Sequence, residues 1–286
     1  MLETPSVDDR ASIAEHVRAS VERLTARERK AVQILLTNYP AAGLAPVAEF
    51  AERAQVSAPT VLRFVAKLGF LGYPDFQRQL REELEAQLAS PLTKRARAAR
   101  PRGLERPLID PFAEAALANL RGTFRHLPEE DFSAIVDLLC DRRRSVHLLG
   151  GRFTDALARY LAAHLSLIRP NVRHVPSGIG VWRDRLLDIG RRDVVVVFDI
   201  RRYQDDVVAF ARDAAARGAE IVLVTDQWLS PLSRQAKYVL ACRVAAPSHW
   251  DSSLALLAVV EALTAAATER LGKFAKKRIE KLERLR

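Results

Sequence analysis

Residues 46–80, PVAEFAERAQVSAPTVLRFVAKLGFLGYPDFQRQL, contain two short runs of apolar residues at helical spacing. Gln55-Val56-Ser57 interrupts the periodicity between them, and Ser57 suits an N-cap because its hydroxyl can accept a hydrogen bond from the first turn. Gly69 is suited to end the second helix. Two amphipathic helices joined by a tight polar turn predict a helix-turn-helix motif. The apolar positions are Val47, Phe50, Ala51 and Ala54 in the first helix, then Val61, Phe64, Val65 and Leu68 in the second.

The second helix of such a motif enters the DNA major groove with its N-terminus first, so its early outward residues reach the bases. A helix that begins at Ala58 leaves an outward set of small, hydroxyl-bearing and basic side chains. Arg63 suits a guanine edge, whereas Lys67 suits a phosphate. The alternative from spacing alone is a helical hairpin with a solvated basic face. The predicted DNA-binding residues are Ser57, Ala58, Pro59, Thr60, Arg63 and Lys67.

The longer sequence around this motif resembles the N-terminal domain of the RpiR family of bacterial transcription regulators. The resemblance begins at Leu24-Thr25-Ala26-Arg27-Glu28-Arg29 and extends to about residue 84. Its most specific part is VSAPTVLRFVAKLGFLGYPDF, residues 56–76, which joins the turn, the second helix, a glycine stop and an aromatic segment in one order. The resemblance implies a helix-turn-helix domain, a linker, and a sugar-isomerase (SIS) domain that senses a phosphosugar.

Composition describes a folded chain with room for two domains. The chain has 286 residues, of which 49% are hydrophobic and 28% charged, and its formal net charge is +10. A basic balance favours polyanionic partners, although the excess is not concentrated in the first 110 residues. The two cysteines, Cys140 and Cys242, lie far apart and form no ligand cluster, so we expect free thiols, no metal and no cofactor. No signal peptide or run of about 18 apolar residues is present, so we predict a cytoplasmic protein with no membrane contact.

A change of composition divides the chain. We predict a helix-turn-helix domain in residues 1–88, a basic linker in 89–107, and a SIS-like domain for effector sensing and oligomerisation in 108–286. The linker holds six Lys/Arg against one acid, Glu105. Such a segment either lies along the DNA backbone and adds salt-dependent affinity, or serves as a plain charged connector.

Strand and helix patterns alternate in the second half. The expected strands cover 146–149, 172–175, 193–198, 220–225 and 237–240, and the expected helices cover 112–124, 129–142, 154–168, 205–217 and 252–271. The predicted fold class is therefore an all-α helix-turn-helix domain followed by an α/β doubly wound parallel-sheet SIS-like domain. In such a sheet, ligands bind at the carboxyl ends of the strands.

Two loops at expected strand ends depart from the SIS pattern. The run Arg217–Asp226 and Ser230-Pro231-Leu232 resemble that domain, but GGRFT at 150–154 replaces a Gly-x-Gly-x-Ser loop, and DIRRYQ at 199–204 replaces Ser-x-Ser-Gly-x-Thr. A remodelled pocket for a sugar phosphate or related anion is one hypothesis, and a domain that has lost its ligand is the other. The candidate effector-binding residues are Gly151, Arg152, Thr154, Asp199, Arg201, Arg202, Gln204, His249 and Asp251.

Three classes of function are compatible with these features. A SIS-fold sugar-phosphate isomerase would need an acid–base pair, but Asp199, His249, Asp251 and Glu261 show no spacing that enforces one. A chromosome-coating architectural protein would use the charged tail 273–286, which is more typical of a helix packed on a partner subunit. We therefore predict a non-enzymatic regulator, a homodimer or homotetramer that binds a near-palindromic double-stranded DNA operator and a small-molecule effector.

Overall fold

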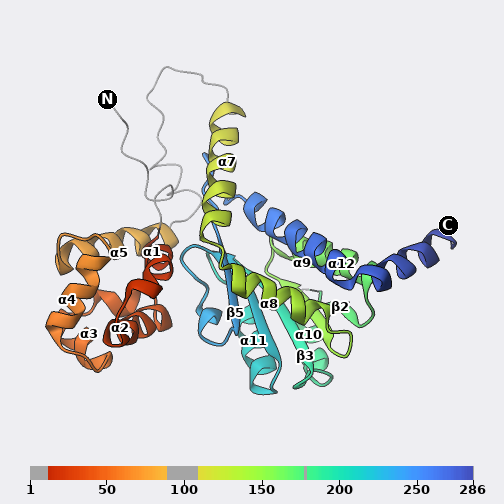
Figure 1. Cartoon of the computed structure of the whole chain (residues 1–286), viewed down its shortest axis with the longest axis horizontal. Coiled ribbons are helices and arrows are strands. Elements are labelled where there is room, and N and C mark those ends of the chain that lie inside the picture. The colour runs from red at the N-terminus through yellow and green to blue at the C-terminus, as the bar shows by residue number, and fades with distance from the viewer. Residues whose placement is uncertain (1–11, 89–108, 177–178, 286) are drawn as a thin grey trace. The chain divides into compact units, whose positions relative to one another are not determined.

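The computed structural model describes residues 12–88, 109–176 and 179–285 (Figure 1). Contacts divide the chain into two units, Met1–His126 with Val244–Ser252, and Leu127–Arg243 with Ser253–Arg286. The expected linker at 89–107 lies outside the described residues. Residues 109–126, which we expected at the start of the second domain, are grouped with the first unit.

The described part of the first unit is mostly helical, and two of its helices begin with a capping box. Helix α1 (Ile13–Ser20) follows Ser12 and α2 (Ala26–Thr37) follows Thr25, each in a capping box with a glutamate three residues later. The helix-turn-helix motif consists of α3 (Val47–Arg53) and α4 (Ala58–Lys67). The other elements are α5 (Tyr73–Leu88), α7 (Ile109–His126) and the 3-10 turns Val21–Arg23 and Ala41–Leu44.

The predicted apolar positions of α4 form one side of the core of this unit. Val61, Phe64 and Val65 are fully buried, and Leu68 is buried beside them. They belong to one cluster with Phe50 of α3 and with residues of α2 and α5. Burial of this stripe fixes which side of α4 faces outward.

Both helices of the motif end in the same hydrogen-bond pattern, with a residue in the left-handed region. After α4, Gly69 has φ 92°, and the Phe70 amide donates to the Val65 carbonyl at 3.3 Å. After α3, Gln55 has φ 53°, and the Val56 amide donates to the Ala51 carbonyl at 3.0 Å. These are Schellman-type ends, for which glycine is the favoured residue. The turn therefore holds Gln55 in a backbone conformation that is energetically unfavourable for any residue with a Cβ atom.

The second unit contains a five-stranded parallel sheet in the order β2-β1-β3-β4-β5. The strands are β1 (Ser145–Gly150), β2 (Val172–His174), β3 (Asp193–Asp199), β4 (Glu220–Asp226) and β5 (Tyr238–Cys242). All residues of β3 are buried, as expected for a central parallel strand. The doubly wound α/β prediction is therefore confirmed.

Helices cover this sheet. They are α8 (Glu129–Cys140), α9 (Asp155–Ile168), α10 (Ile179–Leu186), α11 (Asp205–Ala216) and α12 (Leu254–Glu283). Helices α8 and α9 both pack on α12, and α10 packs on α11. Two features differ from the sequence prediction: α10 was not expected, and α12 continues beyond residue 271 after an interruption at Gly272 (φ 44°, ψ −119°).

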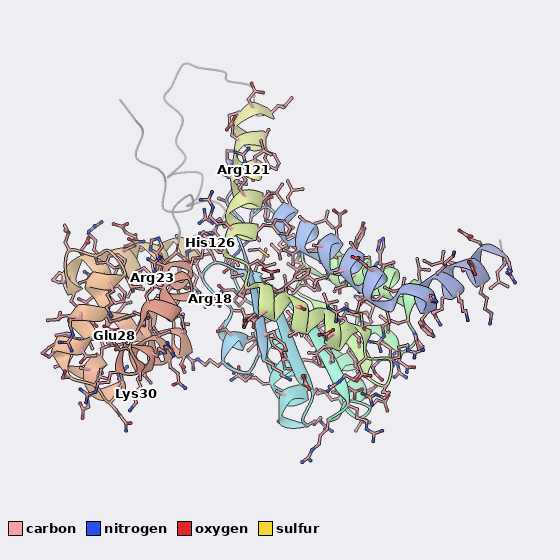
Figure 2. All side chains as sticks on the ribbon, in the orientation of Figure 1. Arg18, Arg23, Glu28, Lys30, Arg121 and His126 are labelled. Carbon is pink, nitrogen blue, oxygen red and sulfur yellow. The ribbon has the colours of Figure 1, made fainter. Side chains whose placement is uncertain are left out.

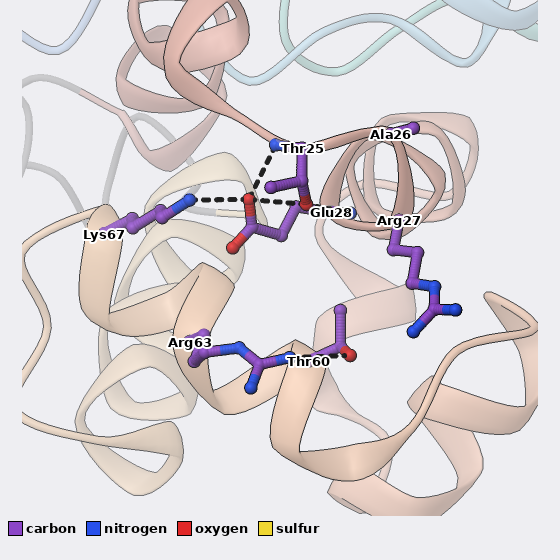
Figure 3. A pocket seen from close by; sticks show the side chains of 7 residues that line it. All are labelled: Thr25, Ala26, Arg27, Glu28, Thr60, Arg63 and Lys67. Atoms are coloured by element: carbon purple, nitrogen blue, oxygen red, sulfur yellow. Dashed lines mark hydrogen bonds and ion pairs between the residues drawn. The ribbon is translucent and has the colours of Figure 1, made fainter.

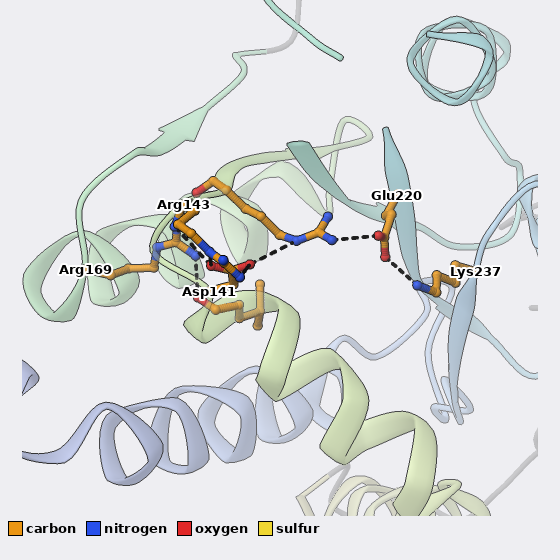
Figure 4. Close-up of polar contacts among 7 residues, drawn as sticks. Asp141, Arg143, Arg169, Glu220 and Lys237 are labelled. Carbon is orange, nitrogen blue, oxygen red and sulfur yellow. Dashed lines mark hydrogen bonds and ion pairs between the residues drawn. The ribbon is translucent and has the colours of Figure 1, made fainter. Parts of the chain in front are cut away.

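A polar network holds the end of α8 against the start of the sheet (Figure 4). Arg169 is fully buried and donates to the carbonyls of Leu139, Arg144 and Pro170. Arg144 pairs with Glu220 at 3.0 Å, and Glu220 accepts a hydrogen bond from Lys237 at 2.7 Å. Because Glu220 begins β4, this network lies at the amino edge of the sheet, opposite the edge where ligands bind. Its role is structural.

Candidate functional site

The outward side of α4 carries most of the predicted DNA-binding residues at its surface. Ser57, Pro59, Arg63 and Lys67 are exposed, and Ala58 is half-buried. Thr60 differs, because it is only 2% exposed. Its hydroxyl forms a 3.0 Å hydrogen bond with the Ser57 hydroxyl and accepts one from the Arg63 guanidinium at 3.3 Å. The expectation that Thr60 faces outward is corrected: it lies on the inner side of the helix start.

Ser57 occupies the N-cap position of α4, but its side chain does not cap the helix. The hydroxyl bonds to Thr60 instead of to a backbone N–H. The predicted capping hydrogen bond is therefore absent. In the first turn of α4, Pro59 has no N–H, and the Thr60 N–H already donates to the Ser57 carbonyl at 2.9 Å.

A hollow of about 510 Å³ separates the start of α2 from α4 (Figure 3). Its lining combines three cationic side chains with one carboxylate and two hydroxyl groups. The lining residues are Thr25, Ala26, Arg27, Glu28, Thr60, Arg63 and Lys67. The hollow brings Arg27, which sequence reasoning did not select, to the same surface as Arg63.

Glu28 is buried in the wall of this hollow, at 2% exposure. One of its oxygens, Oε2, accepts hydrogen bonds from the Thr25 amide at 2.7 Å, the Thr25 hydroxyl at 2.9 Å and the Lys67 ammonium at 2.7 Å. Burial acts to raise the pKa of Glu28, but the bonds from Lys67 and Thr25 outweigh it and leave that pKa below its ordinary value. The exposed cations Arg23 and Lys30 belong to the same unit as Glu28, and all three side chains are labelled in Figure 2.

The second candidate site lies where β1, β3 and β4 end. Gly150 is paired with Phe198, and Asp199 with Thr225, so the loops after these strands start side by side. A Cβ atom on Gly150 would lie 2.6 Å from the Asp155 amide nitrogen, so the first loop requires glycine there. The turn from β1 into α9 therefore brings the backbone at Gly150 too close to the start of α9 for a side chain to fit.

Thr154 ties the first loop to β3. It is 2% exposed, its hydroxyl donates to the Phe198 carbonyl at 2.7 Å, and it accepts from the Gly151 amide at 2.8 Å. The side chain of Gln204 lies against Gly151, and its carbonyl oxygen accepts a hydrogen bond from the Arg152 amide. The structure thus brings together four of the predicted effector residues and bonds them to one another.

Two buried carboxylates end the neighbouring strands. Asp199 is 1% exposed, and its carboxylate accepts hydrogen bonds from the Ser230 hydroxyl at 2.5 Å and from the backbone N–H of Gln204 at 3.4 Å. Burial raises the pKa of Asp199 to about 7, and the charges of Asp226 and Asp206 act in the same direction. Asp226 is fully buried, and burial raises its pKa to about 6.

Asp226 organises the loop after β3. It accepts hydrogen bonds from the Tyr203 hydroxyl at 2.8 Å and the Trp228 amide at 3.0 Å, and also from the Arg201 amide. The Arg201 guanidinium is buried and stands 4.3 Å from the centre of the Trp228 ring. Arg202 is exposed and has φ 64°. The two arginines differ in exposure, and their joint grip on an anion stays a prediction.

The remaining two predicted effector residues, His249 and Asp251, lie in 244–252, a segment grouped with the first unit. Their part in the pocket stays a prediction. Sequence reasoning missed four residues of this site: Tyr203, Asp226, Trp228 and Ser230. A carboxylate and a hydroxyl directly after a buried strand were the available signal.

Three findings on the described residues concern metal ligands, cysteines and membrane spans. Among the described residues, no group of three or more His, Cys, Asp and Glu side chains is placed to hold a metal ion. Cys140 and Cys242 are free thiols, as expected. Across residues 12–88, 109–176 and 179–285, no helix has the length and apolar character needed to cross a membrane.

The two sites and their folds define a class of protein in which a helix-turn-helix domain is joined to a domain of the sugar-isomerase fold. The family profile "Helix-turn-helix domain, rpiR family" matches residues 11–87, and the profile "SIS domain" matches residues 138–266. The chain therefore belongs to the RpiR family of helix-turn-helix proteins with a SIS domain.

Two of the relatives described here resemble the chain over both domains, and a third resembles its second domain alone. It is 27% identical over 272 residues to the HTH-type transcriptional regulator HexR of Escherichia coli (strain K12), a match that covers 91% of this chain and 89% of the relative. The sugar isomerase domain of an RpiR transcription factor from Sphaerobacter thermophilus is 25% identical, with a TM-score of 0.59 over 63% of this chain and 99% of that chain. The Vibrio vulnificus NanR protein, solved in complex with ManNAc-6P, is 18% identical, with a TM-score of 0.55 over 96% of this chain and 97% of that chain.

Proposed function

We propose that this protein is a sequence-specific transcriptional regulator that reads DNA with α4. One observation carries the proposal: α4 buries a continuous apolar stripe, while Ser57, Pro59 and Arg63 stand exposed at its N-terminal half. This is the arrangement that major-groove recognition requires. Arg63 contacts a base edge, and Arg27, across the hollow, contacts the phosphate backbone.

The SIS domain is proposed to bind a small carbohydrate-related anion and to join subunits. Support comes from NanR, a protein of the same fold that was solved with ManNAc-6P. The effector would bind at the loops after β1 and β3, and Arg152, Arg202 and Gln204 are the side chains proposed to contact it. A homodimer or homotetramer matches a near-palindromic operator, and such a regulator acts in the cytoplasm without a cofactor.

Selection of bound fragments from a random double-stranded DNA pool, with the full-length protein, tests the first proposal. We expect enrichment of a two-fold symmetric motif that the protein prefers to random DNA by at least about 10³-fold. Recovery of fragments with no common motif would refute it.

The effector proposal is tested on the selected operator. ManNAc-6P, a set of other sugar phosphates and inorganic phosphate are added to the complex in turn, and dissociation is followed by fluorescence anisotropy. We expect a sugar phosphate to change operator affinity where inorganic phosphate does not. If a broad set of sugar phosphates changes nothing, the alternative of a domain without a ligand is supported instead.

A further inference from the structure

Lys67, at the end of α4, has its charge already paired within the domain. Its ammonium lies 2.7 Å from Glu28 Oε2, although the lysine side chain is 42% exposed and the glutamate side chain only 3%. The pair joins α4 to the first turn of α2 across 39 positions of sequence. An ion pair with one buried partner is screened far less by salt than one at the surface.

Glu28 is fixed independently of Lys67. The Thr25 amide and hydroxyl donate to the same oxygen, and the carboxylate stands in the first turn of α2, where the helix dipole favours a negative charge. Glu28 therefore stays ionised and in place, and the flexible lysine adapts to it. The lysine ammonium is held at the first turn of α2 as a result.

Arg63 has a different environment on the same helix. It is exposed, and its contact within the hollow is to the neutral hydroxyl of Thr60 at 3.3 Å. Among the described residues, no carboxylate forms an ion pair with Arg63, so its charge is available to a polyanion. The two cations of α4 therefore differ: Lys67 is paired with a carboxylate within the domain, whereas Arg63 contacts only a neutral hydroxyl in the hollow.

We propose that Glu28 is a positioning residue that holds Lys67 away from the DNA backbone, so that Lys67 fixes α4 against α2 while Arg63 supplies the charge that meets DNA. The inference rests on the proposed DNA-binding function of α4. Non-specific binding is governed by the number of phosphates that are neutralised, whereas base contacts carry specificity. Withdrawing one cation from the backbone therefore raises the preference for the operator over random DNA.

Glu28→Gln tests this role cleanly, because glutamine also completes a capping box and only the charge is removed. Affinity for the operator and for random DNA is measured by anisotropy between 50 and 200 mM salt. Released from its partner, Lys67 reaches a phosphate, and the slope of log K against log salt steepens by about 0.9. Affinity for random DNA rises, and the ratio of operator to random affinity falls.

Two further variants keep the test decisive. Lys67→Met alone leaves the salt slope unchanged, and in the Glu28→Gln background it abolishes the steepening. Glu82→Gln is the matched control: it removes one negative charge from the same domain, but its partner Arg78 stays paired with Asp75. Its salt slope stays at the wild-type value.

A slope that falls by about 0.9 in Lys67→Met alone would overturn the proposal, because Lys67 would then contact a phosphate in the wild-type protein. An equal steepening in Glu82→Gln would do so as well, since net charge would explain it. Failure of the wild-type protein to prefer any operator would refute the proposed function instead. The slopes on random DNA would still decide the role of Glu28.

Discussion

The outward side of α4 and the loops at the carboxyl edge of the sheet use their polar residues in opposite ways. On α4, Ser57 and Arg63 are exposed, over an apolar side that is fully buried. At the sheet edge, Asp199, Asp226 and Thr154 are buried and hydrogen-bonded to neighbouring loops. The exposed polar groups of α4 are therefore available to a partner, whereas the buried groups at the sheet edge are satisfied within the chain.

The apolar side of α4 must be buried in the core for the opposite side to be presented to solvent. We therefore expect the largest effect from a substitution that disrupts this core packing. Phe64→Ala removes a fully buried ring from the core of the first unit, and we expect its free energy of unfolding to fall by about 3–5 kcal/mol. Urea denaturation followed by circular dichroism measures this. Leu62→Ala, at a side chain that is 45% exposed, is the control and should cost far less. Equal losses in the two variants would show that α4 is not held by this core.

Truncation of the exposed side should leave stability unchanged and weaken DNA binding. Arg63→Ala is expected to cost about 1–3 kcal/mol of operator affinity, because a guanidinium that pairs with a base edge is lost. Anisotropy titrations on operator and random DNA, at one salt concentration, measure the difference. Equal weakening on both DNAs would assign Arg63 to a phosphate.

The buried acids of the sheet edge predict that the second unit is more stable at pH 5 than at pH 7. The pKa of Asp199 is raised to about 7, so between its unfolded value of about 3.9 and pH 7 the folded protein binds more protons than the unfolded chain. The free energy of unfolding therefore falls as pH rises through this window, by up to about 1.4 kcal/mol per pH unit for each such group. Asp226, with a pKa of about 6, acts in the same direction.

Denaturation at pH 5 and pH 7, followed by the fluorescence of Trp182 and Trp228, measures this dependence. Asp199→Asn should reduce it, because the amide accepts and donates hydrogen bonds without a charge. A wild-type protein that is equally stable at both pH values would contradict the raised pKa. It would also weaken the contrast between the buried loops and the exposed helix.

The smallest expected effect concerns the turn that orients α4. Gln55→Gly should stabilise the first unit by about 0.5–1 kcal/mol, because glycine adopts φ 53° without the cost that a side chain incurs there. Gly69→Ala, at φ 92°, is the matched variant of opposite sign and should destabilise by about 1 kcal/mol. Thermal unfolding of both variants provides the measurement. A destabilised Gln55→Gly would mean that the glutamine side chain makes a compensating contact.

Much of the fold could be predicted because its determinants are local. The apolar period of α4, the stop at Gly69 and the continuous strand β3 lie within short stretches, and the structure confirms each. Helix α10 was missed because its eight residues carry a weak apolar period. The continuation of α12 was missed because Gly272 interrupts the helix without ending it. The prediction for Thr60 was wrong because a hydroxyl in the first turn of a helix can form its hydrogen bond either with solvent or with a neighbouring side chain, here Ser57.

Local sequence patterns are enough to predict the two-part architecture, the position of α4 and the family to which the chain belongs. The pairing of polar groups that are distant in sequence follows from how the elements pack. Glu28 meets Lys67 across 39 positions, and Asp199 meets Ser230 across 31. The physical reason is that periodicity and capping act within one or two turns of chain. The pairing of distant charges depends on how separate elements pack, and no short stretch of sequence encodes that.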